Sequence, residues 1–229
     1  MEPKRAKVLT AAKFRHLLRV TDATSRFPER DTLILLLGVM CGMRVTEIAR
    51  LEVRHVLTRS GARCQEVSLP GSITKGCRPR SIYLSHQQTV AALQRYIEWR
   101  YARGMGAALD RRDYRGLMPN TRLVLTQKGG PFELSVKRRT SSDGVLVEYL
   151  AADSLQSYVT GLYRAAGLTN GYSSHSGLSD LCEPTHCAGA LTGHGAASIG
   201  PRSYRPCFPI CGSPGPPTDR GGRCIRWGA

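Results

Sequence analysis

The stretch GMRVTEIARL occupies residues 42–51, at the end of the longest apolar run of the chain. That run predicts a buried helix from Asp31 to Cys41, which ends near Gly42. Thr46 can cap a second, short helix that continues to Arg50. Arg44 is then expected at the turn between the two helices, where a guanidinium can donate two parallel hydrogen bonds to phosphate oxygens.

The segments around this stretch predict an α+β fold that is mainly helical, with a small antiparallel sheet. Thr10 is the expected N-cap of a helix that carries Phe14, Leu17 and Leu18 on one face. A bend at residues 74–76 places Lys75 at a hairpin tip. The predicted strands are Val53–Leu57, Glu66–Leu69 and Ser81–Leu84, and two further helices are predicted at Gln87–Ala102 and Ser154–Ala166.

Composition and charge favour a nucleic-acid partner. The 229 residues suffice for one substantial core. The net charge of +16 favours a polyanion, because Lys and Arg that neutralise phosphates release condensed counterions. The longest apolar run is too short to cross a bilayer and the N-terminus lacks the apolar segment of a signal peptide, so we expect a cytoplasmic protein that does not engage membranes. Its eight cysteines are expected to be mostly reduced.

Two motifs downstream accompany Arg44. ITKGCRPRSIYLS spans residues 73–85, and YSSHSG spans residues 172–177. Together with GMRVTEIARL, these motifs resemble the active-site boxes of tyrosine recombinases, the phage-integrase family. The resemblance covers residues 7–177 and rests on three separated motifs, which makes it more specific than one match. It implies an incomplete tyrosine-recombinase catalytic domain over residues 1–177, truncated before its last helices.

The resemblance also implies roles for individual side chains. Arg44 would stabilise the charge that develops on a scissile phosphate. Lys75 would protonate the departing 5′ oxygen as a general acid, and His175 would hold the phosphate and assist proton transfer. Arg78 and Arg80 would contact DNA phosphates nearby. In isolation, the same patterns are also typical of a surface arginine, a solvated hairpin lysine and a histidine at a helix start.

The implied activity is site-specific DNA recombination or integration by strand breakage and rejoining through a phosphotyrosine intermediate. It needs no metal or other cofactor. The expected partner is double-stranded DNA, on which copies of the chain would form a homo-oligomer. Most relatives carry a separate helical domain before the catalytic one, so this chain is either a short member or a truncated one. Weaker and less specific DNA binding is expected in both cases.

The chain departs from the family pattern at Leu178, which occupies the slot of the second arginine. His194 superficially resembles the third box and Tyr204 the nucleophile, but no helical apolar pattern connects them. Residues 178–229 are rich in Pro, Gly and Cys, which predicts a disordered tail. The tail holds several Cys and His residues, but it has no Cys-x-x-Cys pair, and its spacings argue against a zinc site.

A reading-frame shift at codon 178 would account for this tail. Two hypotheses of different classes follow: a recombinase by descent whose cleavage is impaired, because the second arginine and the tyrosine are lost, and a non-catalytic basic DNA-binding protein. When the codons are reread one base out of register, permitted codons for Ser179–Glu183 can encode Arg-Thr-Phe-Ala-Asn, which supplies the missing arginine. Those for Ala196–Pro201 can encode Gln-Leu-Leu-Leu-Gly-His, and the junction of Ile210 and Cys211 can encode Tyr, which supply the third box and the nucleophile.

Overall fold

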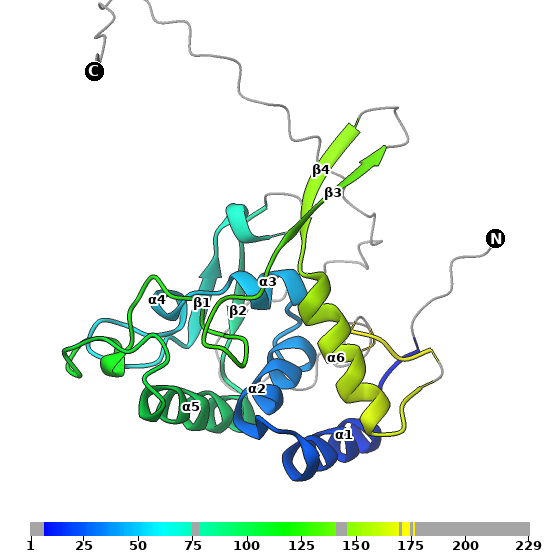
Figure 1. Cartoon of the computed structure of the whole chain (residues 1–229), viewed down its shortest axis with the longest axis horizontal. Helices are drawn as coiled ribbons and strands as arrows, with labels where there is room; N and C mark the ends of the chain where they lie inside the picture. The colour runs from blue at the N-terminus through cyan, green and yellow to red at the C-terminus, as the bar shows by residue number, and fades with distance from the viewer. Residues whose placement is uncertain (1–6, 75–77, 141–145, 170, 175, 177–229) are drawn as a thin grey trace, which may run out of the picture.

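The computed structural model describes residues 7–74, 78–140, 146–169, 171–174 and 176, with the remaining residues drawn as a grey trace (Figure 1). Lys75, His175 and residues 178–229 therefore lie outside the described residues, and so do the predictions made for the tail, including Tyr204 and the absence of a zinc site. In the described part of the chain, no helix is long and apolar enough to cross a bilayer.

The described residues form an α+β fold that is mainly helical, with two separate two-stranded antiparallel hairpins. The fold class predicted from the sequence is confirmed. In chain order the elements are α1 (Ala11–Thr24), α2 (Pro28–Val39), α3 (Val45–Arg50), α4 (Val53–Val56), β1 (Glu66–Leu69), η1 (Gly71–Ile73), β2 (Arg80–Tyr83), α5 (Gln87–Ala102), η2 (Tyr114–Gly116), β3 (Ser135–Thr140), β4 (Leu146–Ala151) and α6 (Asp153–Ala165).

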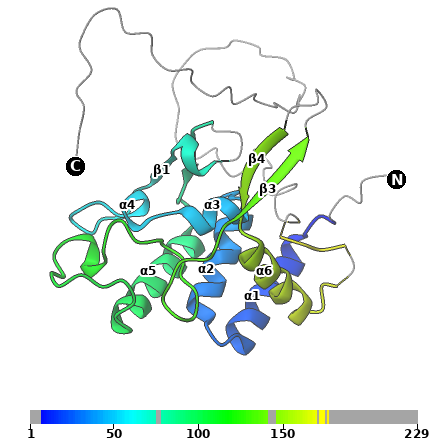
Figure 2. The same ribbon diagram turned by 45° about the horizontal axis from the view of Figure 1, so that its top comes forward.

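Helix α2 is the centre of the core. Residues 30–37 and Val39 are buried, so the helix is covered on almost every side. An all-round apolar helix is stable only when other elements surround it. Both views place α2 between α5 on one side and α1 on the other, and it packs against both (Figures 1 and 2). Pro28 occupies the first turn of α2, where its missing N–H costs no helical hydrogen bond.

Helix α1 begins as the sequence predicts. The Thr10 hydroxyl accepts a hydrogen bond from the Lys13 N–H at 3.4 Å, which makes Thr10 the N-cap. Phe14 and Leu17 are buried on one face of the helix. Helix α5 spans the predicted range, Gln87–Ala102. Its periodicity was readable because Leu93 and Ile97 recur at helical spacing and are both buried.

The two hairpins differ in what they cover. In the first, β1 pairs with β2, and Val67 faces Ile82 on the buried side. In the second, β3 pairs with β4, with Val136 opposite Leu150. The second hairpin projects away from the helices in both views (Figures 1 and 2), and five large apolar residues of it are exposed. These five are Val136, Leu146, Val147, Tyr149 and Leu150.

Two local predictions were wrong. The segment Val53–Leu57 was predicted as a strand, but residues 53–56 form the helical turn α4. Valine favours strands in general, yet Val53 and Val56 are one helical turn apart and both are buried on the same side. Helix α3 was predicted to be capped by Thr46, but its N-cap is Arg44.

Candidate phosphate-binding site

Arg44 lies at the N-cap of α3, directly after the turn that follows α2. Its backbone is extended, with φ −76° and ψ 150°. The preceding Gly42 has φ +60°, a conformation that L side chains rarely adopt, and this reverses the chain between the two helices. The Met43 N–H donates to the Leu37 carbonyl at 3.1 Å, which ties the turn to the end of α2. Arg44 is thus presented from a tightly defined backbone.

A buried carboxylate holds the Arg44 side chain. The Glu47 side chain is only 1% exposed, and its Oε1 lies 3.1 Å from Arg44 Nη1. Its Oε2 accepts a hydrogen bond from the Arg44 backbone N–H at 2.8 Å. The first turn of α3 is therefore closed by the side chain of its own third residue, as in a capping box. The Arg44 side chain remains 46% exposed.

Arg80, from the start of β2, shares the same carboxylate. Its Nη2 lies 2.5 Å from Glu47 Oε2, and it also donates to the Gly42 carbonyl at 2.9 Å. One buried negative charge thus joins two guanidinium groups, which leaves a net positive charge facing solvent. The hydrogen bonds that the described residues make with the Arg44 guanidinium use only Nη1. Among the described residues, the other N–H groups of this guanidinium have no hydrogen-bond partner, and their fork geometry suits a phosphate.

The segment that carries Lys75 is bounded by residues that are described. Thr74 is buried, and its hydroxyl donates to the Arg78 carbonyl at 2.6 Å, so the two ends of residues 74–78 are held together. Arg78 itself is exposed. Two residues on, Arg80 reaches Glu47. The described residues that follow this segment therefore reach the carboxylate that holds Arg44 through Arg80.

The residues flanking His175 approach the same region from α6. Ser173 and Ser176 form a closed turn, in which the Ser173 N–H donates to Ser176 Oγ at 2.9 Å and the Ser176 N–H donates to the Ser173 carbonyl at 2.9 Å. Ser174 lines a small cavity of about 20 Å³ together with Met43 and Val45, the two neighbours of Arg44. The parts of the three motifs that the structure describes are thus brought together by the fold.

Comparison with known proteins supports the architecture. No family model matches the sequence, and no curated protein matches it. Among solved structures, the chain is similar to XerA recombinase, with a TM-score of 0.50 and 14% identity over 77% of this chain and 49% of XerA. It is also similar to the XerH site-specific recombinase in a post-cleavage complex, with a TM-score of 0.47 and 16% identity over 78% of this chain and 41% of XerH.

The chain has a tyrosine-recombinase catalytic-domain fold. It spans about half the length of XerA recombinase. The three-dimensional likeness to XerA recombinase covers 77% of the chain. The roles of Arg44, Lys75, His175, Arg78 and Arg80 stay predictions, because a likeness at 14% identity concerns the fold alone.

One residue of this tyrosine-recombinase fold was missed by the sequence reasoning. Glu47 was quoted within the motif but was assigned no role. Its signal was the spacing: a glutamate three residues after Arg44 lies on the same helical turn and can reach back to it. Arg80 was predicted to contact DNA phosphates, whereas in the described structure one of its nitrogen atoms is bonded to Glu47 and to the Gly42 carbonyl.

Cys41 lies next to this turn in sequence but is not equipped as a nucleophile. Burial raises the pKa of its thiol to about 11. At neutral pH the thiol is therefore protonated, whereas the thiolate is the reactive form. Both Cys41 and Cys64 are free thiols in the described part of the chain.

Proposed function

We propose that this chain descends from a site-specific DNA recombinase and that its core binds a backbone phosphate of double-stranded DNA through Arg44. Lys75 and His175 are proposed to complete the cluster, and Arg78 to contact a neighbouring phosphate. The observation that carries the proposal is the arrangement around Glu47. This carboxylate holds Arg44 at a turn through one guanidinium nitrogen among the described contacts, and described residues of the other two motifs, Arg80 and Ser174, lie beside Glu47 and beside the neighbours of Arg44.

The chemistry of such a site requires fixed positive charge. In strand exchange through a phosphotyrosine, a tyrosine oxygen forms a bond to phosphorus while the bond from phosphorus to the 5′ oxygen breaks. Negative charge builds on the non-bridging oxygens, and an arginine already in place stabilises it without reorganisation. A proton must reach the departing 5′ oxygen, and Lys75 is the proposed donor.

Cleavage by the chain as it stands is proposed to be impaired. Leu178 stands in the slot of the second arginine and can donate no hydrogen bond. A frameshift at codon 178 is proposed as the origin of residues 178–229, which would make residues 1–177 an incomplete catalytic domain. The alternative function, a basic protein that binds DNA without cutting it, rests on the net charge of +16.

The binding half of the proposal is tested with the Arg44→Gln variant of the full chain. Its affinity for a mixed-sequence duplex is measured by fluorescence anisotropy and compared with that of the wild type. Loss of two charge-assisted hydrogen bonds to phosphate is expected to weaken binding by about tenfold. Arg54→Gln is the matched control, because Arg54 is 53% exposed and pairs with Glu52 at 2.8 Å, away from Glu47. Equal losses in the two variants would contradict a specific role for Arg44.

The cleavage half is tested with nicked suicide duplexes, in which a covalent protein–DNA adduct accumulates if the tyrosine attacks. Salt-sensitive retardation without an adduct is the expected result for the chain as it stands. An adduct that disappears in Tyr204→Phe would overturn the proposed impairment. A chain translated in the alternate frame after codon 178 is expected to regain the adduct, and the encoding nucleotide sequence would show directly whether that frame is open.

A further inference from the structure

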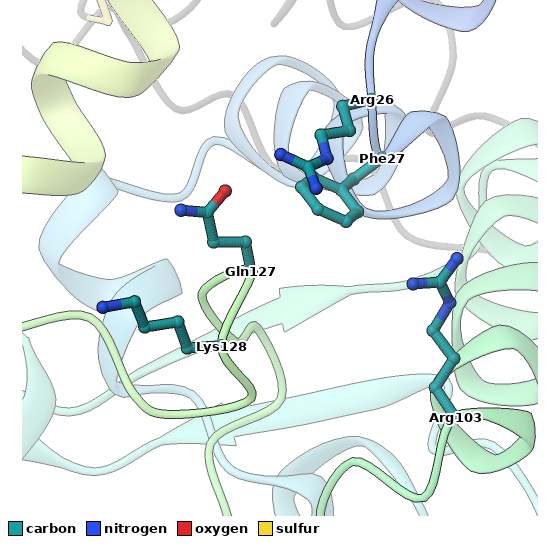
Figure 3. Close-up of a pocket in the computed structure, with 5 residues that line it drawn as sticks. All are labelled: Arg26, Phe27, Arg103, Gln127 and Lys128. Carbon is teal, nitrogen blue, oxygen red and sulfur yellow. The ribbon is translucent and has the colours of Figure 1, made fainter.

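A depression of about 430 Å³ lies at the N-terminal end of α2, far from Arg44 along the chain's central helix. Its lining residues are Arg26, Phe27, Arg103, Gln127 and Lys128 (Figure 3). They come from three separate segments: the α1–α2 connection, the C-cap of α5 and the loop that follows Leu125. Three of the five side chains are cationic, and none is acidic.

The two arginines of the depression are seated on a pair of aromatic rings. The Arg26 guanidinium lies 5.5 Å from the centroid of the Phe27 ring, and the Arg103 guanidinium lies 4.6 Å from that of Trp99. The two rings themselves meet edge to face, with centroids 6.0 Å apart. A guanidinium that contacts a ring with its flat face keeps the N–H groups at its edge available to donate hydrogen bonds. The depression therefore presents two arginine forks whose positions are coupled.

The third cation is carried by a closed turn. The Thr126 N–H donates to the Gly130 carbonyl at 2.8 Å, and the Thr126 hydroxyl donates to the same carbonyl at 3.0 Å. Gly129 supplies the positive φ of +80° that this turn needs. Gln127 and Lys128 project from the turn on the side of the depression opposite Arg103 (Figure 3). The amide of Gln127 adds donors that carry no charge.

The cations of the depression form no ion pair within the described residues. No ion pair there joins Arg26, Arg103 or Lys128 to a carboxylate. Asp31, in the first turn of α2, is fully buried and already bonded to Arg30 and Tyr158. An anion bound among these side chains would be attracted by all three positive charges.

We propose that this depression is a second anion site, which takes a free oligophosphate with at least three linked phosphate groups. A chain of phosphates carries enough negative charge to match three cations, whereas a single carboxylate does not. Arginine forks bind phosphate oxygens in a bidentate manner. The volume falls in the range of about 300–1,000 Å³ that is common for small-ligand sites.

The phosphates, rather than an attached base, are expected to be recognised. Phe27 is only 8% exposed, and Arg26 and Arg30 lie over its ring at 5.5 and 4.7 Å, so neither a base nor a sugar has a free aromatic surface there. The identity of the nucleoside should therefore have little influence on affinity. The site does not involve Arg44, so this proposal stands or falls independently of the recombinase proposal.

The depression and the Arg44 turn are two separate places on the molecule. Helix α2 has 12 residues, so the depression and the Arg44 turn lie at opposite ends of a rod about 18 Å long. A duplex that ran from Arg44 along α2 would cover this length with roughly five base pairs. The source of the phosphates is therefore a matter for a competition experiment.

The test is a titration of the full-length chain with inorganic tripolyphosphate. Binding is monitored through the fluorescence of Trp99, whose ring contacts Arg103. Trp227→Phe serves as the background, because the chain has two tryptophans. Saturable quenching is expected, and Arg26→Gln with Arg103→Gln should weaken binding by about tenfold or more. The matched control is Arg111→Gln, which removes an arginine stacked on Tyr101 at 4.9 Å outside the depression and should change affinity less than about twofold.

Three further arms complete the test. ATP and GTP should bind as tightly as each other, and a preference for one base would overturn recognition by phosphates alone. A duplex that displaces tripolyphosphate, and whose own binding is weakened by the double variant, would assign the phosphates to DNA and overturn the free ligand. Polyglutamate binding as tightly as tripolyphosphate, or equal losses in the double variant and Arg111→Gln, would show attraction by net charge only.

Discussion

Two buried carboxylates lie near the two ends of helix α2, and they differ in how many hydrogen-bond donors of their arginine partner are engaged. At the beginning of α2, Asp31 is bonded to Arg30, whose side chain is only 3% exposed. After its end, Glu47 is bonded to Arg44, whose side chain is 46% exposed. Both carboxylates are almost inaccessible to solvent, so burial of the acid does not distinguish them.

The donors of the arginine do distinguish them. Arg30 bonds to Asp31 through Nε, to the Leu125 carbonyl through Nη1 and to the Tyr158 hydroxyl through Nη2, and it lies 4.7 Å from the Phe27 and Tyr158 ring centroids. A guanidinium with every nitrogen engaged joins elements together and has nothing to offer a ligand. Arg44, with one engaged nitrogen among the described contacts, can still bind an anion. The comparison thus separates a structural ion pair from a candidate site.

The largest expected effect is on stability at the Asp31 end. Asp31→Asn leaves a buried guanidinium without its counter-charge, which should cost about 3–5 kcal/mol in the free energy of unfolding. Urea unfolding followed by circular dichroism measures this loss. DNA binding by the folded fraction should be unchanged, since Asp31 lies at the other end of α2 from Arg44. A loss below about 1 kcal/mol would show that Arg30 finds another partner and would remove the contrast.

Glu47→Gln should have a smaller effect on stability and a larger one on binding. The partners of Glu47, Arg44 and Arg80, are 46% and 33% exposed and can turn to water, so we expect a loss of about 2 kcal/mol. The freed guanidiniums should lose their fixed positions, which weakens DNA binding by about threefold to tenfold despite the more positive charge. Tighter binding in Glu47→Gln would show that net charge, and not placement, governs the site.

Tyr158→Phe examines the Asp31 end with a neutral change. The Tyr158 hydroxyl donates to Asp31 Oδ2 at 2.7 Å, so its removal should cost about 1 kcal/mol at neutral pH. Burial, followed by the hydrogen bond to Asp31, raises the pKa of Tyr158 above its ordinary value of 10. The native protein therefore holds this proton more tightly than the unfolded chain, and the associated stability is lost as the pH rises above 10. Unfolding is measured at steps of about one pH unit from about pH 8 to about pH 11. The free energy of unfolding should fall less with rising pH in Tyr158→Phe than in the wild type.

Arg44→Gln should produce the smallest change in stability. Its ion pair with Glu47 is half exposed, and Glu47 keeps Arg80 as a partner, so a loss of about 0.5 kcal/mol or less is expected. Thermal unfolding of this variant beside Asp31→Asn measures both ends of α2 by one method. A loss comparable with that of Asp31→Asn would mean that Arg44 is a structural residue like Arg30.

Sequence patterns predicted the elements that have one buried face. Helix α5 repeats apolar residues at helical spacing, and β1 alternates exposed and buried positions, so each carries a period that can be read along the chain. The hairpin of β3 and β4 was not predicted. The described side chains of β4 are exposed or nearly so, and without a buried face there is no alternation to recognise. The α4 turn was misassigned because four residues are too few for a helical period to outweigh the strand preference of valine.

The sequence by itself predicted the fold, because three separated motifs and the apolar run before Arg44 are local patterns that need no coordinates. It also determined a positive charge that suits phosphate. Only the tertiary structure decided which arginines keep free donors. Arg30, Arg44 and Arg80 have the same side chain. Arg30 and Arg80 are held by groups from distant parts of the chain, whereas the described partner of the Arg44 side chain is Glu47, three residues away. A guanidinium can bind a ligand only through N–H groups that the fold leaves without a partner, and the three-dimensional neighbours determine which these are.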